Sequence, residues 1–432
     1  MSRIVLVLVV ALLARLAAWA YFERQIAADA SRDYVVAGDA DGYWDLGLYV
    51  AAGREYAVHT PPRRAMRPPG VPAVIAASVR VFGEDRSAAR GVLAALCAAG
   101  PVFVFLTAWL FLPPRESLIA GLLAAASPLA VGLSPTLLSD GPFATALAAT
   151  VLAAARSWQS PRTRSWAAAA GLAAAAAILI RSAWLPAAIA AVAVWPALGR
   201  GWRPALVYAA VLAAGLAPWT VRNGLSAGRY TPTTLWVGPT LYDSFRPDAD
   251  GGSDMRFFDA DADERAKMSE VEVDRWYRDR AVRLIIDDPT RAAGLILSKQ
   301  ARFWSVWPGS GDAGPAAVRL AIAAWTVAIL TLAVIGGWRH RRRWVLLVAC
   351  VGPLLYFAAL HAVFVGSMRY RMPAELPLCV LAAAAFVKPG SQSPRGGPPP
   401  RGGRSSSESA EPGRRPSDPS ASGGAAGRTS SR

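Results

Sequence analysis

The chain has 432 residues, of which 54% are hydrophobic and 18% are charged, and its mean hydropathy is +0.30. This composition excludes an ordinary soluble domain and is typical of a polytopic helical membrane protein. The net charge of +16 does not indicate nucleic-acid binding, because the arginines lie mainly in short loops and the tail, and no nucleic-acid-binding motif accompanies them. Cys97, Cys350 and Cys379 all lie in apolar segments without CxxC spacing, which argues against disulfides and a zinc cluster.

The first apolar segment covers residues 4–21 and follows Arg3. It is longer than the apolar core of a signal peptide, and no clean cleavage site precedes soluble sequence. We therefore predict an uncleaved first span with its amino terminus in the cytoplasm. Arg15 interrupts this segment, either as a side chain that extends to the membrane boundary or as a buried polar contact.

Ten further apolar segments follow, and the short basic loops between them predict which ends are cytoplasmic. The segments cover residues 70–82, 88–112, 117–133, 135–155, 166–180, 183–198, 204–219, 315–338, 344–365 and 372–387. The basic loops contain residues 115, 156–164, 200–203 and 339–343. This orientation holds only if one early segment does not cross, and residues 70–82 are too short at a rise of about 1.5 Å per residue. We predict an all-α polytopic bundle of about ten transmembrane helices, with a re-entrant or juxtamembrane helix at residues 70–82.

The predicted topology places four loops on the outer face and both termini in the cytoplasm. The outer loops cover residues 22–85, 134–140, 221–314 and 361–371. Residues 1–387 then form one membrane domain. Residues 388–432 contain no large apolar side chain, and eight basic and three acidic residues give them a charge of +5. We expect this segment to be a disordered cytoplasmic tail, either weakly attracted to anionic lipids or without a role.

The long outer segment, residues 221–314, is expected to form a small cap on the membrane domain. Its pattern predicts turns followed by helices over residues 262–287 and 289–304, with Pro289 in the first turn of the second helix. Asp248, Asp250 and Asp254 resemble a calcium-binding loop, but the spacing and the terminal Glu of an EF-hand are missing. We do not assign a metal site there.

Five polar motifs occur in a recognisable order at the predicted outer ends of the spans. They are Gly-Asp-Ala-Asp-Gly-Tyr-Trp at residues 38–44, Arg-Pro-Pro-Gly at 67–70, Ser-Asp at 139–140, Pro-Trp-Thr-Val-Arg-Asn at 218–223 and Arg-Tyr-Arg-Met-Pro at 369–373. The ordered set resembles bacterial GT-C glycosyltransferases, in particular the group of protein O-mannosyltransferases and the lipid A aminoarabinose transferase. The resemblance implies a GT-C-like bundle and a sugar donor linked to polyprenyl phosphate. Ala40 stands where protein mannosyltransferases often have a second acidic residue, which weakens a specific claim of protein mannosylation.

The carboxylates of the first outer loop are candidates for the chemistry of sugar transfer. The reaction needs a base that takes the acceptor proton. Asp39, four residues before Tyr43 in the family-like D-x-x-x-Y pattern, is the predicted base, while Asp41 and Asp45 either orient the acceptor or bind a divalent metal. Asp140, at the outer end of a span, is a second catalytic candidate. The alternative for each is helix capping.

Four arginines lie at outer span boundaries, where the positive-inside bias disfavours them: Arg67, Arg222, Arg369 and Arg371. A lipid phosphate compensates such charges, because a guanidinium binds phosphate oxygens in bidentate geometry. By position, Arg67 resembles the basic residue of the family's basic-Pro-Pro element and is the first candidate. Non-specific contact with headgroups is the alternative. Arg181, Lys299 and His361 are possible helpers or plain structural residues.

We expect a glycosyltransferase in the bacterial inner membrane, with its active face outside. It would move a sugar from a polyprenyl-phosphate donor to an acceptor hydroxyl on a glycolipid, a polysaccharide or a protein. The alternative is a transporter or flippase that moves the lipid-linked sugar without catalysis. The sequence contains no Walker loop, dinucleotide fingerprint, HExxH or GxSxG motif. The sugar, the acceptor and any need for a divalent metal stay open.

Overall fold

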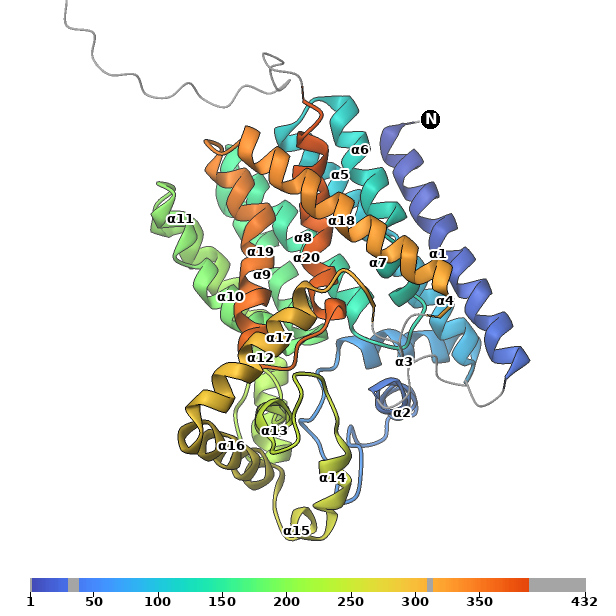
Figure 1. Cartoon of the computed structure of the whole chain (residues 1–432), viewed down its shortest axis with the longest axis vertical. Coiled ribbons are helices and arrows are strands. Elements are labelled where there is room, and N and C mark those ends of the chain that lie inside the picture. Colours follow the sequence, from blue (N-terminus) through green and yellow to red (C-terminus); the bar gives the residue numbers. More distant parts are fainter. Residues whose placement is uncertain (1, 30–38, 309–313, 388–432) are drawn as a thin grey trace, which may run out of the picture. The chain divides into compact units, whose positions relative to one another are not determined.

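The computed structural model describes residues 2–29, 39–308 and 314–387, and helices form most of that part of the chain (Figure 1). No strand occurs among these residues. Six helices or helix pairs are long and apolar enough to cross a membrane. The predicted all-α membrane fold is therefore confirmed, whereas the count of about ten crossings stays a prediction. The predicted disordered tail, residues 388–432, lies outside the described residues.

The six candidate spans include one pair of helices that are nearly continuous. They are α1 (Arg3–Ala28), α4 with α5 (Arg86–Cys97 and Ala99–Phe111), α9 (Thr163–Ile180), α12 (Trp202–Ala227), α18 (Ala316–Arg339) and α19 (Trp344–Val363). The break between α4 and α5 falls at Ala98, where Pro101 occupies the first turn of α5. Pro101 has no N–H to donate to the carbonyl of Cys97, so the helical hydrogen-bond pattern is already interrupted at this point.

The remaining apolar segments form helices outside this set of candidate spans. They are α6 (Pro114–Ala126), α7 (Pro128–Leu133), α8 (Asp140–Gln159), the 3₁₀ turn η2 (Ser182–Trp184), α10 (Leu185–Ala191), α11 (Val194–Ala197) and α20 (Met368–Ala384). Pro128 separates α6 from α7, because the residue before a proline disfavours the helical conformation. The helix in the apolar segment predicted at residues 135–155 is α8, and it begins only at Asp140. Turns and bends occupy residues 135–139.

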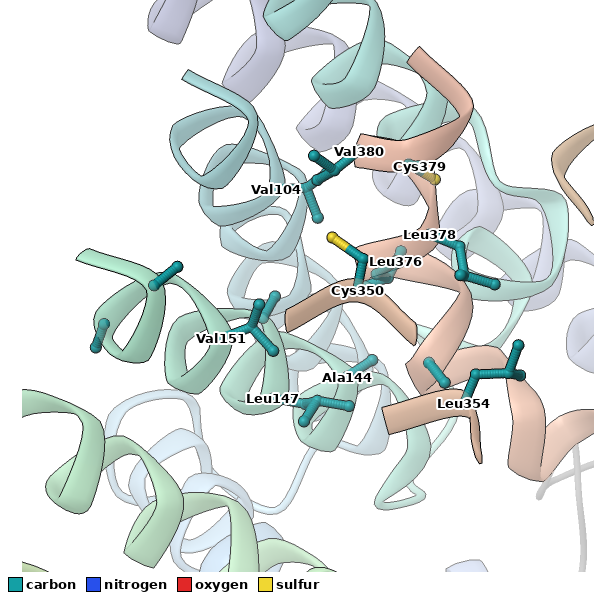
Figure 2. Close-up of a cluster of buried hydrophobic side chains, with 14 of the residues drawn as sticks. Val104, Ala144, Leu147, Val151, Cys350, Leu354, Leu376, Leu378, Cys379 and Val380 are labelled. Carbon is teal, nitrogen blue, oxygen red and sulfur yellow. The ribbon is translucent and has the colours of Figure 1, made fainter. Parts of the chain in front are cut away.

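Helix α20 lies among α5, α6, α8, α17, α18 and α19. All its residues are buried except Arg369 and Tyr370. Figure 2 shows its apolar side chains meeting those of α5, α8 and α19, with Cys379 and Cys350 in the same cluster. Burial of this surface holds α20 in place. Arg369 and Tyr370, the two residues that are not fully buried, therefore lie on a helix whose position is fixed by packing.

Two short helices between α1 and α4 lie beside the bundle. Residues 70–82 form α3 (Gly70–Phe82), which is the short helix that the sequence predicts, and it packs against α2 (Asp39–Ala51). Tyr43 and Trp44 of α2 share a buried cluster with Val71 and Ile75 of α3. This packing fixes the start of α2.

The cap contains α13 (Val237–Phe245), α14 (Arg256–Ala260), α15 (Ala262–Ala266), α16 (Glu270–Asp287) and α17 (Pro289–Trp304). The prediction of α17 is confirmed, with Pro289 in its first turn. The single helix predicted over residues 262–287 is wrong, because the chain breaks before Glu270. Ser269 caps α16 by accepting from the Glu272 N–H, and the Glu272 side chain accepts from the Ser269 N–H. This capping box starts a new helix.

Candidate active site

An ion pair joins the start of α2 to the loop that precedes α3. Nη1 of Arg67 donates a hydrogen bond of 2.9 Å to the carboxylate of Asp39. The same guanidinium lies over the ring of Tyr43, 4.8 Å from its centroid. A Cβ at Gly42 would lie 2.7 Å from Nε of Arg67, so the glycine makes room for this approach. The carboxylate, the ring and the glycine together fix one orientation of the guanidinium.

The backbone of the Arg67 loop is held by side chains from two directions. The hydroxyl of Tyr56 donates to the carbonyls of Arg67 and Pro68, each at 3.1 Å. Arg222 of α12 donates to the carbonyl of Tyr56 at 2.8 Å and also to the carbonyl of Arg64. Its guanidinium lies over the ring of Tyr56. Arg222 therefore positions the loop.

The cap holds the same loop through Glu270, the first residue of α16. Its two carboxylate oxygens accept from the N–H groups of Arg64 and Ala65, each at 2.8 Å. Burial raises the pKa of Glu270, although these two hydrogen bonds and nearby arginines oppose the shift. Because the two backbone donors match both carboxylate oxygens, Glu270 fixes the approach to Arg67 from the cap side.

A second ion-pair cluster lies at the start of α8. The side chain of Asp140 is fully buried, and its two oxygens accept from Arg181 at 2.5 Å and from Nε of Arg369 at 2.8 Å. Arg181 lies between α9 and η2, and its guanidinium lies 4.9 Å from the ring centroid of Tyr370. A buried carboxylate is costly without such partners. Asp140 thus holds two arginines from different parts of the chain together.

Residues of both clusters line one cavity of about 580 Å³, called the polar cavity below, although Asp140 itself is not among its lining residues. The bundle and the first outer loop contribute Asp39, Tyr43, His59, Met66, Arg67, Pro68, Ser139, Ile180, Arg181, Ser182, Val365, Arg369 and Tyr370. The cap side contributes Thr234, Trp236, Thr240, Asp243, Ser253, Met255, Phe258 and Asp259. The cavity therefore lies where the cap meets the ends of the helices.

Asp39 is ionised in this cavity. Removal from bulk water favours the neutral acid, but the charge and hydrogen bond of Arg67, with help from Arg369, outweigh that effect and lower the pKa of Asp39. The Asp39 side chain is 56% exposed, and it lines the cavity. Asp39 is a charged carboxylate surrounded by protein and open to a ligand.

Four of the seven site residues proposed from the sequence do not line the cavity, and Asp140, which binds Arg181 and Arg369, is one of them. Arg371 is fully buried, where it binds Glu375 at 2.7 Å and the carbonyls of Phe303 and Ser305 at 2.5 and 3.0 Å. Those carbonyls end α17, so Arg371 attaches the cap to α20. Arg222 positions the loop as described above, and Asp41 lies on α2 outside the lining.

No group of three or more metal-binding side chains occurs in the part of the chain that the structure describes. The acidic turn that resembles a calcium loop is occupied by arginines: Asp248 binds Arg246, and Asp254 binds both Arg246 and Arg256. Asp39 and Asp140 also each have arginine partners. The described side chains therefore offer no ready set of ligands for a divalent metal.

An apolar cavity of about 270 Å³ lies among α8, η2, α10, α11, α12 and α19. Its lining includes Trp184, Tyr356, Trp158, Trp195 and Leu198. Trp184 lies three residues after Arg181. Trp184 of the apolar cavity and Arg181 of the polar cavity are therefore close neighbours in the sequence.

Several lining residues were missed by the sequence analysis. His59 has a φ of 67°, an unusual value for a residue with a side chain. Burial and then the charges of Arg67 and other arginines lower its pKa, which favours a neutral imidazole at neutral pH. Asp243, Trp236 and Phe258 come from the cap. None of these has a local sequence signal, because their convergence depends on tertiary packing.

Comparisons with known proteins identify the fold. Residues 66–221 match the sequence model of the dolichyl-phosphate-mannose-protein mannosyltransferase family. An oligosaccharyltransferase from Archaeoglobus fulgidus, solved with a tethered acceptor peptide, superimposes with a TM-score of 0.51 at 17% identity, over 88% of this chain and 49% of that chain. ArnT from Cupriavidus metallidurans, solved with undecaprenyl phosphate, gives a TM-score of 0.44 at 15% identity, over 88% and 77% of the two chains. A search of curated protein sequences found no match.

The family match and the shared fold confirm the resemblance to GT-C glycosyltransferases. The matched residues include Arg67, Asp140 and Arg181, whereas Asp39 precedes them. The chain spans about half the length of the oligosaccharyltransferase. At 17% identity this likeness shows a common fold, and the function must be argued from the site.

Proposed function

We propose that this chain is an integral membrane glycosyltransferase that moves a sugar from a polyprenyl-phosphate carrier to an acceptor hydroxyl at the outer face of the membrane. One observation carries the proposal: the ionised carboxylate of Asp39 shares a polar cavity with the guanidinium groups of Arg67, Arg181 and Arg369. The match to a family named for a lipid-phosphate sugar donor supports it.

The chemistry assigns a separate task to each charge. The acceptor oxygen attacks the anomeric carbon of the sugar and passes its proton to Asp39. The bond between the anomeric carbon and the phosphate oxygen breaks, and its electron pair stays on the leaving polyprenyl phosphate. Guanidinium groups stabilise the charge that develops on that phosphate.

The two ion-pair clusters, counted without Asp243 and Asp259 on the cap side of the cavity, carry one net positive charge. Three guanidinium groups, those of Arg67, Arg181 and Arg369, face two carboxylates, Asp39 and Asp140. Three positive charges minus two negative charges leave an excess of one. A phosphodiester carries one negative charge and would balance this excess. Arg67 and Arg369 are the proposed phosphate contacts, and Asp140 positions Arg369 and Arg181.

Donor binding would also increase the basicity of Asp39. In the structure, Arg67 stabilises the ionised form of Asp39, which makes that carboxylate a weaker base. A donor phosphate that takes part of the Arg67 hydrogen-bonding capacity would weaken this ion pair. The pKa of Asp39 would then rise when the donor is bound, at the stage where its carboxylate must accept a proton.

The apolar cavity suits the lipid part of the donor. Its lining of tryptophans, tyrosines and aliphatic side chains presents no charged group. An isoprenoid chain can replace lipid there without loss of hydrogen bonds, and it would leave the phosphate near Arg181. The basic loops at the opposite helix ends support an outer orientation of the polar cavity.

A proteoliposome assay tests this function against transport without catalysis. The purified protein would be reconstituted with radiolabelled polyprenyl-phosphate mannose and a mixture of glycolipid, polysaccharide and peptide acceptors. A glycosyltransferase moves the label to an acceptor, or slowly to water, and releases polyprenyl phosphate. Movement of intact donor between leaflets with no release of polyprenyl phosphate would instead establish a flippase.

A further inference from the structure

A second polar cavity, of about 450 Å³, adjoins the active-site cavity on the cap side. The two share Ser253, Val365, Arg369 and Tyr370 in their linings. Its other walls come from the loop between α13 and α14, from Arg302 of α17 and from residues 366–367 ahead of α20. A ligand in this cavity would therefore reach Arg369 from the cap side.

The walls of the second cavity are rigidly held. Asp243 of α13 accepts from the Ser253 hydroxyl at 2.7 Å and from the Asp254 N–H at 2.9 Å. The N–H of Gly366 donates to the carbonyl of Gly251 at 2.9 Å, which ties the cap loop to the segment before α20. A loop that is fixed before binding loses little conformational entropy when a ligand arrives.

Arg291 adds a third set of constraints to this loop. It donates to the carbonyls of Phe245, Arg246 and Pro247 at 3.0, 2.5 and 2.9 Å. These bonds satisfy the last carbonyl of α13 and the first two carbonyls after it, and they fix the start of the loop. The second cavity is thus a preformed site.

The chemistry of the lining suits a sugar better than a peptide. Paired carboxylates and guanidinium groups cover the walls, among them Asp250 with Arg302 at 2.6 Å and Asp254 with Arg256 at 2.5 Å. Such pairs present hydrogen-bond acceptors and donors side by side, which matches the neighbouring hydroxyls of a sugar ring. A peptide would need apolar pockets for its side chains, and the lining offers few apolar groups.

One arginine of the lining stays open to a ligand although it has a partner. Each of the four arginines, Arg246, Arg256, Arg302 and Arg369, binds an aspartate. The Arg256 side chain is 88% exposed, so its guanidinium can still donate to a ligand. A carboxylate or phosphate on the sugar would receive charge-assisted hydrogen bonds from this group.

We propose that this second cavity is the acceptor subsite, and that it binds a saccharide carrying a carboxylate or phosphate group. This assignment rests on the proposed glycosyltransferase function and names the class of its acceptor. The acceptor saccharide enters from the cap, and its reactive hydroxyl passes Arg369 into the cavity that contains Asp39. The donor occupies the membrane side.

A binding measurement on the full-length protein in nanodiscs tests the subsite without turnover. The probes are fluorescently labelled tetramannuronate, mannotetraose as its uncharged counterpart, and a serine- and threonine-containing peptide of similar size. We expect tetramannuronate to bind at least tenfold more tightly than either other probe. Equal binding of mannotetraose, or tighter binding of the peptide, would overturn the assignment.

The variant Arg256→Ala locates the site, with Arg275→Ala as the control. Both residues are exposed, and Arg275 lies on α16 outside the lining of the second cavity. We expect Arg256→Ala to weaken tetramannuronate binding about tenfold and Arg275→Ala to change it less than twofold, because loss of one charge-assisted hydrogen bond has about this effect. Equal effects of the two variants would show that tetramannuronate binds elsewhere.

Slow transfer of the donor sugar to water separates this proposal from the function on which it rests. Donor hydrolysis needs the active-site cavity and no acceptor. If Arg256→Ala hydrolyses donor at the wild-type rate but binds tetramannuronate about tenfold more weakly, both proposals are supported. If wild-type protein binds tetramannuronate yet never releases polyprenyl phosphate, the glycosyltransferase function fails and the saccharide-binding site remains. Wild-type donor hydrolysis without tetramannuronate binding rejects the acceptor subsite alone.

Discussion

The carboxylate of Asp39 accepts a hydrogen bond of 2.9 Å from the guanidinium of Arg67, which lies 28 positions later in the chain. This contact unites a candidate base with a candidate phosphate ligand. It depends on a third residue, because a side chain at Gly42 would collide with the guanidinium. The relationship can therefore be tested by a substitution that changes neither partner.

Replacing Gly42 by Ala should reduce sugar transfer at least tenfold without unfolding the protein. The new methyl group would meet the movable end of Arg67 at 2.7 Å, so the side chain shifts while the backbone stays. Small displacements of a reacting group have effects of this size. Alanine also favours helix α2 by up to about 1 kcal/mol, so the melting temperature should not fall.

Gly294→Ala in α17 is the matched control, because nothing lies within 4 Å of its Cβ position. Transfer rates and melting temperatures of both variants in detergent would check the prediction. Normal transfer by Gly42→Ala would show that the position of Arg67 does not limit activity.

Removing Arg67 should move the acid limb of the pH profile upward. The ion pair lowers the pKa of Asp39, so wild-type kcat/KM should stay constant down to below the ordinary aspartate pKa of about 3.9. In Arg67→Met the pKa of Asp39 rises, and its active, ionised form is lost at a higher pH. The residual activity should therefore fall off earlier on acidification.

Arg275→Met, a change of an exposed arginine on α16, controls for the loss of one positive charge. The measurement is kcat/KM against pH for donor hydrolysis in the three proteins. An unchanged acid limb in Arg67→Met would mean that Asp39 is not the titrating group.

The fold and much of the site could be predicted from local sequence. Apolar segments predicted the helices, and the short length of residues 70–82 predicted α3. Asp39 and Arg67 are proposed from motifs that resemble those of GT-C enzymes, and Asp140 and Arg369 are proposed because charged residues at span ends need partners. All four line or directly support one cavity in the structure.

What could not be predicted depends on packing between distant segments. Arg369 and Arg371 are two positions apart, so the helix turns them in different directions, one toward Asp140 and the other toward the end of α17. In the sequence, Arg369 and Arg371 carry the same charge and lie at the same predicted span boundary. Their different contacts therefore could not be predicted from position. The break before α16 was missed because its apolar stripe continues across the capping box of Ser269.

Replacing Asp140 by Asn should destabilise the protein by about 3 kcal/mol. Two arginines would keep their positions at a fully buried side chain without its balancing charge, and loss of one partner from a buried ion pair has a cost of this order. The unfolding transition in detergent should shift accordingly. Asp248→Asn, at an exposed carboxylate of the cap, should shift it little, and equal shifts would contradict the buried-pair explanation.

Labelling of single cysteines tests the proposed orientation. The three native cysteines are buried, so background labelling by a membrane-impermeant maleimide should be low. Cysteine at Glu264 in the cap should be labelled in intact cells, whereas cysteine at Ser165 in a basic loop should require permeabilised cells. The reverse pattern would place the active site on the cytoplasmic side.

The most direct test of the central claim is sugar transfer by purified Asp39→Asn. The substitution keeps the size and most hydrogen bonding of the side chain and removes the proton acceptor. We predict normal folding and donor binding, with turnover reduced about a hundredfold or more, the usual contribution of a general base. Turnover within a few fold of wild type would contradict base catalysis by Asp39.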